Sequence, residues 1–172
     1  MIKLITPALG DVHLYDFCEL NERDRLVVLR LRNHPEVQMW MYDCSDISVE
    51  DHISFIESLK NDSSRKYFLV KQSTEPIGVF YLTKLNDVNK SLELGLYINF
   101  FDRTKKAGSA IIESAISYIR SALKYKKVML EVFEENTVAV NFYKRYGFNI
   151  ASNSNVNDRM VNKMVLFMDD VL

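Results

Sequence analysis

The chain has 172 residues, a hydrophobic content of 48% and a formal net charge of −1, with 22 basic against 23 acidic residues. This length predicts one domain, residues 1–172, and this balance of charge gives no electrostatic footprint for nucleic acid or an anionic membrane. Two isolated cysteines, Cys18 and Cys44, favour a reducing cytoplasm over a disulfide framework or a zinc site. Residues 1–7 are too short for a signal peptide, and no apolar run approaches the ~20 residues that cross a bilayer.

The first half of the chain predicts a strand, two helices and three further strands. Alternating apolar residues predict an edge strand at 12–17. Asn21 is a predicted N-cap for a helix over residues 22–33, which Pro35 ends. Ser48 and Asp51 resemble a capping box and open a second helix that runs to about residue 60. The strands that follow are predicted at residues 66–71, 76–85 and 92–98.

The second half predicts a helix–strand–helix arrangement followed by two strands. A basic loop over residues 102–108 leads into a helix that runs to about residue 123. A strand at 127–132 and a helix at 137–146 follow, with final strands at 148–152 and 163–168. This order of elements predicts an α/β protein whose mixed sheet carries helices on both faces.

The most informative motif lies between Asn136 and Phe148 and reads N-x-x-A-V-x-F-Y-K-x-x-G-F. Its apolar residues, Tyr143 among them, could simply form the core-facing stripe of an amphipathic helix. As a whole, however, the pattern resembles the C-terminal signature of the GNAT superfamily of acetyl-CoA-dependent N-acetyltransferases. The resemblance implies acetyl-CoA as cosubstrate, no metal, and a mixed, largely antiparallel twisted sheet of about seven strands.

The loop before the 108–123 helix is a candidate phosphate site, because a helix N-terminus attracts anions. It resembles the GNAT pyrophosphate loop R/Q-x-x-G-x-G/A, although Lys106 replaces the first glycine and would require a different backbone angle. Taken alone, such a basic loop could equally be a solvated connection. The resemblance implies that the strand before it binds the pantetheine arm through its backbone. The implied cofactor-binding residues are Leu96, Tyr97, Ile98, Arg103, Lys105, Lys106, Ala107, Gly108, Ser109 and Asn136.

Acyl transfer to an amine needs a neutral amine, a stabilised oxyanion and a proton for the departing thiolate. A tyrosine can supply that proton, and by family resemblance Tyr143 is this acid; its alternative role is core packing. Glu131 lies in a Leu-Glu-Val context that resembles GNAT members in which the glutamate accepts the amine proton. Glu93, His52 or a water molecule are open alternatives for the base.

The segment over residues 32–42, R-N-H-P-x-x-x-x-W-M-Y, indicates which class of acceptor the enzyme acetylates. It resembles the N-acetyltransferases of the pseudaminic acid pathway in flagellated bacteria, which acetylate the 4-amino group of a UDP-linked 4-amino-4,6-dideoxy-N-acetyl-altrosamine. Residues of this chain suit such a substrate. The planar guanidinium of an arginine and the ring N–H of a histidine can donate to phosphate. A tyrosine ring can stack on uracil, and a methionine can fill the gap beside it. The implied substrate-binding residues are Arg32, Met41, Tyr42, His52 and Tyr81.

Some of these residues have simpler interpretations. The run 39–41 could be ordinary core, and Arg32 a helix-end residue. Tyr81 stands where relatives carry smaller residues, which could shift the sugar or the base relay. A ribosomal-protein or peptide N-terminal acetyltransferase and a non-catalytic sensor of CoA or nucleotide are the competing functions. An exposed strand edge would also permit a homo-oligomer.

Overall fold

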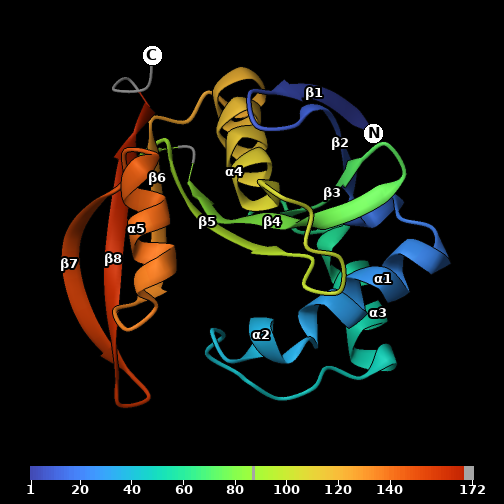
Figure 1. Ribbon diagram of the computed structural model, residues 1–172, viewed down its shortest axis with the longest axis horizontal. Helices are drawn as coiled ribbons and strands as arrows, with labels where there is room; N and C mark the ends of the chain where they lie inside the picture. The colour runs from blue at the N-terminus through green and yellow to red at the C-terminus, as the bar shows by residue number, and fades with distance from the viewer. Residues whose placement is uncertain (87, 169–172) are drawn as a thin grey trace.

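The computed structural model describes residues 1–86 and 88–168. Within them, eight strands form one sheet in the order β1-β2-β3-β4-β5-β6-β8-β7 (Figure 1). Every neighbouring pair is antiparallel except β5 and β6, which are parallel. The strands are β1 (Ile2–Thr6), β2 (Gly10–Asp16), β3 (Lys66–Gln72), β4 (Glu75–Asn86), β5 (Ser91–Ile98), β6 (Lys127–Phe133), β7 (Asn149–Val156) and β8 (Arg159–Phe167).

The helices cover both faces of this sheet, so the predicted mixed α/β fold class is confirmed, with eight strands rather than about seven. Among the described residues, no helix is both long and apolar enough to cross a membrane. The helical elements are η1 (Phe17–Glu19), α1 (Glu22–Arg32), α2 (Pro35–Gln38), α3 (Val49–Leu59), α4 (Ala107–Tyr118), η2 (Ile119–Leu123) and α5 (Thr137–Arg145).

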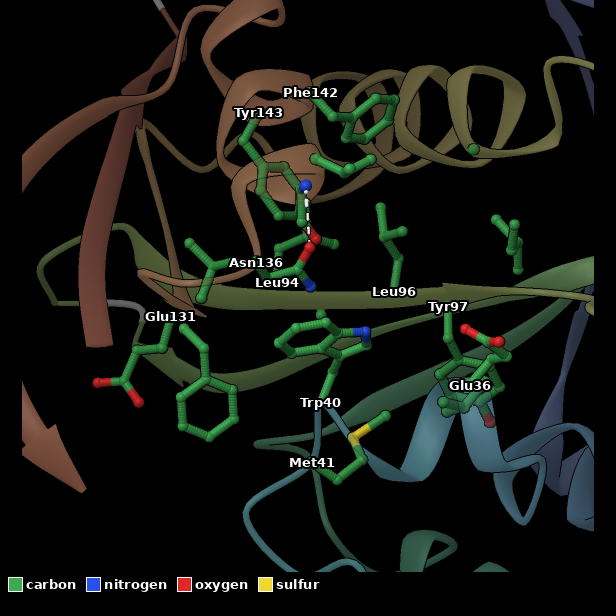
Figure 2. Close-up of a pocket in the computed structure, with 18 of the residues that line it drawn as sticks. Glu36, Trp40, Met41, Leu94, Leu96, Tyr97, Glu131, Asn136, Phe142 and Tyr143 are labelled. Carbon is green, nitrogen blue, oxygen red and sulfur yellow. Dashed lines mark hydrogen bonds between the residues drawn. The ribbon is translucent and has the colours of Figure 1, made fainter. Parts of the chain in front are cut away.

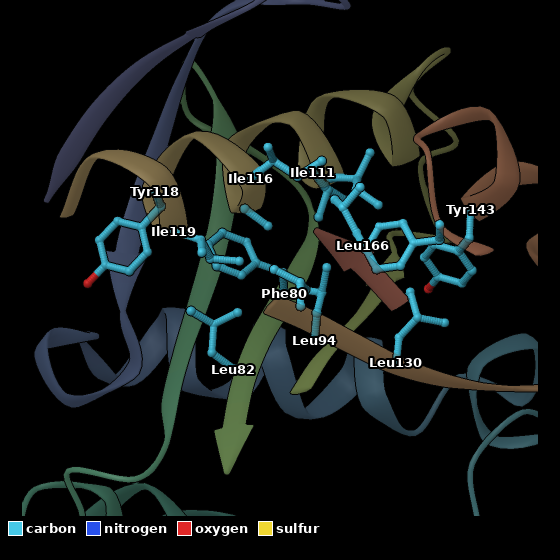
Figure 3. Close-up of a cluster of buried hydrophobic side chains, with 14 of the residues drawn as sticks. Phe80, Leu82, Leu94, Ile111, Ile116, Tyr118, Ile119, Leu130, Tyr143 and Leu166 are labelled. Carbon is cyan, nitrogen blue, oxygen red and sulfur yellow. The ribbon is translucent and has the colours of Figure 1, made fainter. Parts of the chain in front are cut away.

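Two hydrophobic cores lie on opposite faces of the sheet. The larger packs α4 and α5 against the strands and contains Phe80 and Leu94 (Figure 3). The smaller packs α1 and α3 against the other face and contains Leu69 and Val79. Successive side chains of a strand point to opposite faces, which is why the neighbours Val79 and Phe80 belong to different cores.

The helix starts follow the capping pattern of the sequence. Asn21 accepts the Asp24 amide at 2.9 Å, and Ser48 accepts the Asp51 amide at 3.0 Å. Both predicted N-caps are therefore confirmed. Helix α1 ends before Pro35 as predicted, and this proline opens the short helix α2. Proline suits a first helical position because its missing N–H has no intrahelical partner there.

The N-terminal edge of the sheet differs from the prediction. Strand β1 pairs with β2 from Ile2↔Leu14 to Thr6↔Gly10, so β2 is an internal strand and the predicted edge strand at 12–17 is wrong. Val12 and Leu14 are fully buried, as an internal strand requires. The edges are β1 and β7; a homo-oligomer that uses such an edge stays a prediction.

The C-terminal hairpin is longer than predicted. Strands β7 and β8 are joined by Asn157 and Asp158, whose φ angles are 49° and 60°. Positive φ at both central residues is the signature of a type I′ turn, which matches the twist of the flanking strands. The turn extends pairing to Val156↔Arg159, so β8 begins four residues before the predicted start at 163.

Gly95 and Tyr81 form a tight cross-strand pair between β4 and β5. A methyl group at position 95 would lie 2.1 Å from Cζ of Tyr81. The Tyr81 ring is stacked on Tyr67, with centroids 5.0 Å apart and an interplanar angle of 12°. A residue without a side chain at position 95 therefore lets the Tyr81 ring lie across β5.

We expect Gly95→Ala to destabilise the protein by about 1–3 kcal/mol, because the added methyl overpacks this contact. In a Tyr81→Ala background the same change should cost much less, since the conflicting ring is gone. Urea unfolding of the four proteins measures both costs. Gly108→Ala is the matched control, because a methyl group there has its nearest neighbours at 3.7 Å. Equal costs in both backgrounds would show that Tyr81 is not the obstacle.

Candidate active site

Strands β5 and β6 pair only between residues 91–93 and residues 127–129. Beyond this short ladder, β5 stays paired with β4 as far as Ile98, and β6 stays paired with β8 as far as Phe133. The two strands therefore diverge. A cavity of about 860 Å³ lies at this divergence, lined by residues of both strands and of α5 (Figure 2).

Four parts of the chain line the cavity in Figure 2: α5 with Tyr143, β5 with Leu94 and Leu96, β6 with Glu131, and the segment after α2 with Trp40. The cavity thus brings together elements that are far apart in the sequence. The predicted site residues that line it are Met41, Tyr42, Tyr81, Leu96, Tyr97, Ile98, Arg103, Gly108, Glu131, Asn136 and Tyr143.

The free edge of β5 can bind an extended ligand through its backbone. The Asn99 amide donates to the Ile77 carbonyl at 2.9 Å. Hydrogen-bonded and non-hydrogen-bonded pairs alternate along an antiparallel ladder, so Tyr97 also directs its peptide groups to β4. Those of Leu96 and Ile98 point to the opposite edge, where β6 has diverged. This placement agrees with the backbone role expected of Leu96 and Ile98, but not of Tyr97.

Asn136 is the N-cap of α5, and Tyr143 lies in the second turn of this helix. The Asn136 side-chain oxygen accepts the Ala139 amide at 3.1 Å and caps the helix. Tyr143 is 8% exposed, and its ring projects from α5 toward β5 (Figure 2). Burial raises the pKa of Tyr143, so the hydroxyl stays protonated and can act as a donor.

Glu131 lies across the cavity on β6 and is held by two partners. The Tyr42 hydroxyl donates to its Oε2 at 2.5 Å, and Lys163 Nζ lies 3.2 Å from its Oε1. Partial burial raises the pKa of Glu131, but the Tyr42 and Lys163 contacts outweigh burial and lower the pKa overall. Burial and the bond to Glu131 raise the pKa of Tyr42. Glu131 is therefore an ionised acceptor at neutral pH.

The other cavity carboxylates among the described residues are Glu36 and Glu93. Glu93 is paired with Lys84 Nζ at 2.8 Å, so it resembles Glu131 in carrying one lysine partner. In the same part of the chain, no three His, Cys, Asp or Glu side chains gather where they could hold a metal ion. Glu131 and Glu93 are thus the two base candidates that reach the cavity.

The basic loop before α4 contributes only part of its predicted set. Arg103 and Gly108 line the cavity, whereas Lys105, Lys106, Ala107 and Ser109 do not. Lys106 caps α4 with a φ of 67°, the left-handed conformation that glycine favours. The prediction that a lysine at this glycine position would adopt a different backbone angle is therefore wrong. Lys106 keeps the left-handed conformation, at a steric cost of roughly 1 kcal/mol.

Two predicted substrate residues lie outside the cavity. His52 is 4% exposed, and its Nε2 lies 3.0 Å from the Arg25 carbonyl, between α3 and α1. This placement contradicts the expectation that His52 donates to a substrate phosphate, and burial lowers its pKa. Arg32 donates to the Asp43 carbonyl at 3.0 Å, and its Nη1 is buried without a partner among the described residues. Its phosphate role stays a prediction.

Several lining residues were not predicted. Phe133 lies two residues beyond Glu131, so the two-residue period of a strand could have placed it on the same face. Trp40 belongs to the distinctive 32–42 segment, but the apolar character of residues 39–41 equally fits ordinary core. Arg145 follows Tyr143 by two positions and had no signal of its own.

Comparison with known proteins agrees with this geometry. The family model described as the acetyltransferase (GNAT) domain matches residues 19–163. Acetyltransferase PseH of Campylobacter jejuni is 34% identical over 139 residues, which cover 81% of this chain and 85% of the relative. Spermidine N(1)-acetyltransferase of Escherichia coli is 24% identical over 137 residues, covering 76% and 70% of the two chains.

Solved structures show the same fold. The crystal structure of Campylobacter jejuni PseH in complex with acetyl coenzyme A matches with a TM-score of 0.73 and 27% identity, over 91% of this chain and 98% of that one. Spermidine N-acetyltransferase from Vibrio cholerae, in complex with CoA and spermine, matches with a TM-score of 0.82 and 21% identity, over 92% and 96%. With a family match over residues 19–163, the chain belongs to the GNAT family and is an acetyl-CoA-dependent N-acetyltransferase.

Proposed function

We propose that this enzyme acetylates the 4-amino group of UDP-4-amino-4,6-dideoxy-N-acetyl-β-L-altrosamine, a UDP-linked amino hexose of pseudaminic acid biosynthesis. The observation that carries the proposal is one cavity with Tyr143 on its α5 side and Glu131 on its β6 side. Support for the acceptor comes from the 34% identity to PseH and from the 32–42 segment, which contributes Met41 and Tyr42 to the cavity.

Acetyl-CoA would bind along the free edge of β5. The peptide groups of Leu96 and Ile98 would pair with the amides of the pantetheine arm, as a neighbouring strand would. The pyrophosphate would lie at the N-terminus of α4, where free amides and the helix dipole favour anions. Arg103 adds positive charge at this end of the cavity.

The chemistry would be a direct transfer without an acyl-enzyme. Glu131, directly or through water, accepts one proton from the substrate ammonium and leaves a neutral amine that attacks the thioester carbonyl. A C–N bond forms and the C–S bond breaks, with Tyr143 donating its proton to the departing sulfur. The second amine proton, lost on amide formation, restores the Tyr143 hydroxyl through solvent.

The acceptor would lie between the 39–42 residues and β6. Tyr42 offers a flat ring for the uracil, Met41 fills the space beside it, and Tyr81 forms the floor over Gly95. Because Tyr81 is large, it would limit the depth to which a hexose can enter. We therefore propose that Tyr81, which stands where relatives carry smaller residues, changes the position of the bound sugar and does not affect the base.

Removing the Tyr143 hydroxyl tests the proposed acid. We expect Tyr143→Phe to lower kcat by about 10²–10⁴-fold, the range for a lost general acid, with the KM for acetyl-CoA nearly unchanged. Thiol release measured with a thiol reagent gives both constants. Tyr146→Phe, at the C-cap of the same helix, is the control, because the Tyr146 hydroxyl bonds Glu113 outside the cavity at 3.1 Å. Unchanged turnover in Tyr143→Phe would remove Tyr143 as the acid.

A second pair of variants tests the base. Glu131→Gln should lower kcat by about 10²-fold or more, whereas Glu93→Gln should have a small effect. Because the pKa of Glu131 is lowered, the carboxylate stays ionised at neutral pH. The acid limb of the kcat profile should then fall below about pH 4.3, the ordinary glutamate value. A larger loss in Glu93→Gln would transfer the base role to Glu93.

A comparison of acceptors tests the proposed substrate. With acetyl-CoA fixed, we expect turnover of the UDP-linked 4-amino sugar to exceed that of spermidine and of an alanine-started peptide by at least about 10²-fold in kcat/KM. UDP alone should raise Tm independently of CoA, since each ligand would fill its own half of the cavity. Preferred turnover of spermidine or of the peptide would overturn the acceptor but leave the acetyltransferase chemistry intact.

A further inference from the structure

Arg159, the first residue of β8, contacts two separate parts of the cavity wall. Its Nε and Nη2 donate to Glu135 Oε1 at 2.8 and 2.5 Å, and its Nη1 donates to the Met39 carbonyl at 3.1 Å. The guanidinium carbon lies 3.5 Å from the ring centroid of Phe133 and 5.6 Å from that of Trp40. One side chain thus joins the end of β6 to the segment that follows α2.

That segment, residues 39–47, carries the acceptor side of the cavity. Its far end is fastened to α1, because Asn33 exchanges two hydrogen bonds with the backbone of Ile47 at 2.8 and 3.0 Å. Toward β6 and β8, the contacts include the Arg159 group, the Tyr42–Glu131 bond, an Asn157 bond to the Tyr42 carbonyl at 3.4 Å and the Tyr42 ring on Phe133, with centroids 5.6 Å apart. No strand pairing holds the 39–47 segment in place there, so its position depends on side chains.

We propose that Arg159 is a positioning residue that holds the 39–47 segment against β6 and so fixes Trp40 and Met41 at the acceptor site. This inference rests on the proposed function only in naming the acceptor side. A planar guanidinium can stack on Phe133 while its donors reach Glu135 and the Met39 carbonyl together. The compact ammonium of lysine cannot satisfy all three contacts, so the position calls for arginine.

Trp40 is the single tryptophan of the chain, so its fluorescence reports directly on this contact. We expect Arg159→Ala to shift the emission maximum to longer wavelength and to increase quenching by acrylamide. Arg65→Ala is the matched control, because Arg65 also combines an ion pair, to Asp62, with a position over a ring, that of Phe55, away from the cavity. Its spectrum should equal that of the wild type. An unchanged spectrum in Arg159→Ala would overturn the proposal.

Kinetics separate positioning from a general loss of structure. Arg159→Ala should raise the KM for the UDP-linked 4-amino sugar roughly tenfold, because the 39–47 segment would then be in its binding position only part of the time, with the KM for acetyl-CoA unchanged. Arg159→Lys and Glu135→Gln, milder changes that should fold, are expected to give smaller rises in the same constant. Equal rises in both KM values, or none, would contradict the proposal. If the wild type does not turn over this sugar, the proposed function fails and the fluorescence result still decides the role of Arg159.

Discussion

A parallel ladder that stops at residue 93 leaves the second half of β5 with peptide groups that β6 does not satisfy. Backbone groups need partners when water is excluded, so such an edge binds a ligand or stays wet. At Leu96 and Ile98 this edge borders the cavity. The cavity, the proposed path of the pantetheine arm and the separation of Tyr143 from Glu131 all follow from this divergence.

Both hydrophobic cores extend to the walls of the cavity. Tyr143 belongs to the core beneath α4 and α5, whereas Tyr81 and Tyr97 pack against the core beneath α1 and α3. Because β5 lies between them, each core reaches the cavity from its own side. Burial raises the pKa of all three hydroxyls, so they stay protonated and available as donors. On the acceptor side, by contrast, the 39–47 segment is held by side chains.

Local structure was predictable wherever a short stretch of sequence contains its own signal. Asn21 and Ser48 mark helix starts because each side chain bonds an amide three residues later. Strand β1 was not predicted, because its five residues form a strand only through their pairing with β2. The polar stretch of β7 was cut short for the same reason, since its partner and the turn at Asn157 decide its length.

For the site, the sequence by itself determined the resemblance to GNAT acetyltransferases, through the motif around Tyr143, and the two residues that this resemblance implies, Tyr143 and Glu131, line one cavity. Only the tertiary structure decided which polar side chains reach that cavity. His52 has a helix position that could face a substrate, yet its ring is buried against Arg25. Arg159 carried no signal, because its partner Met39 lies 120 residues away. Periodicity and caps are properties of neighbouring residues, whereas contacts across the fold depend on how the strands and helices pack.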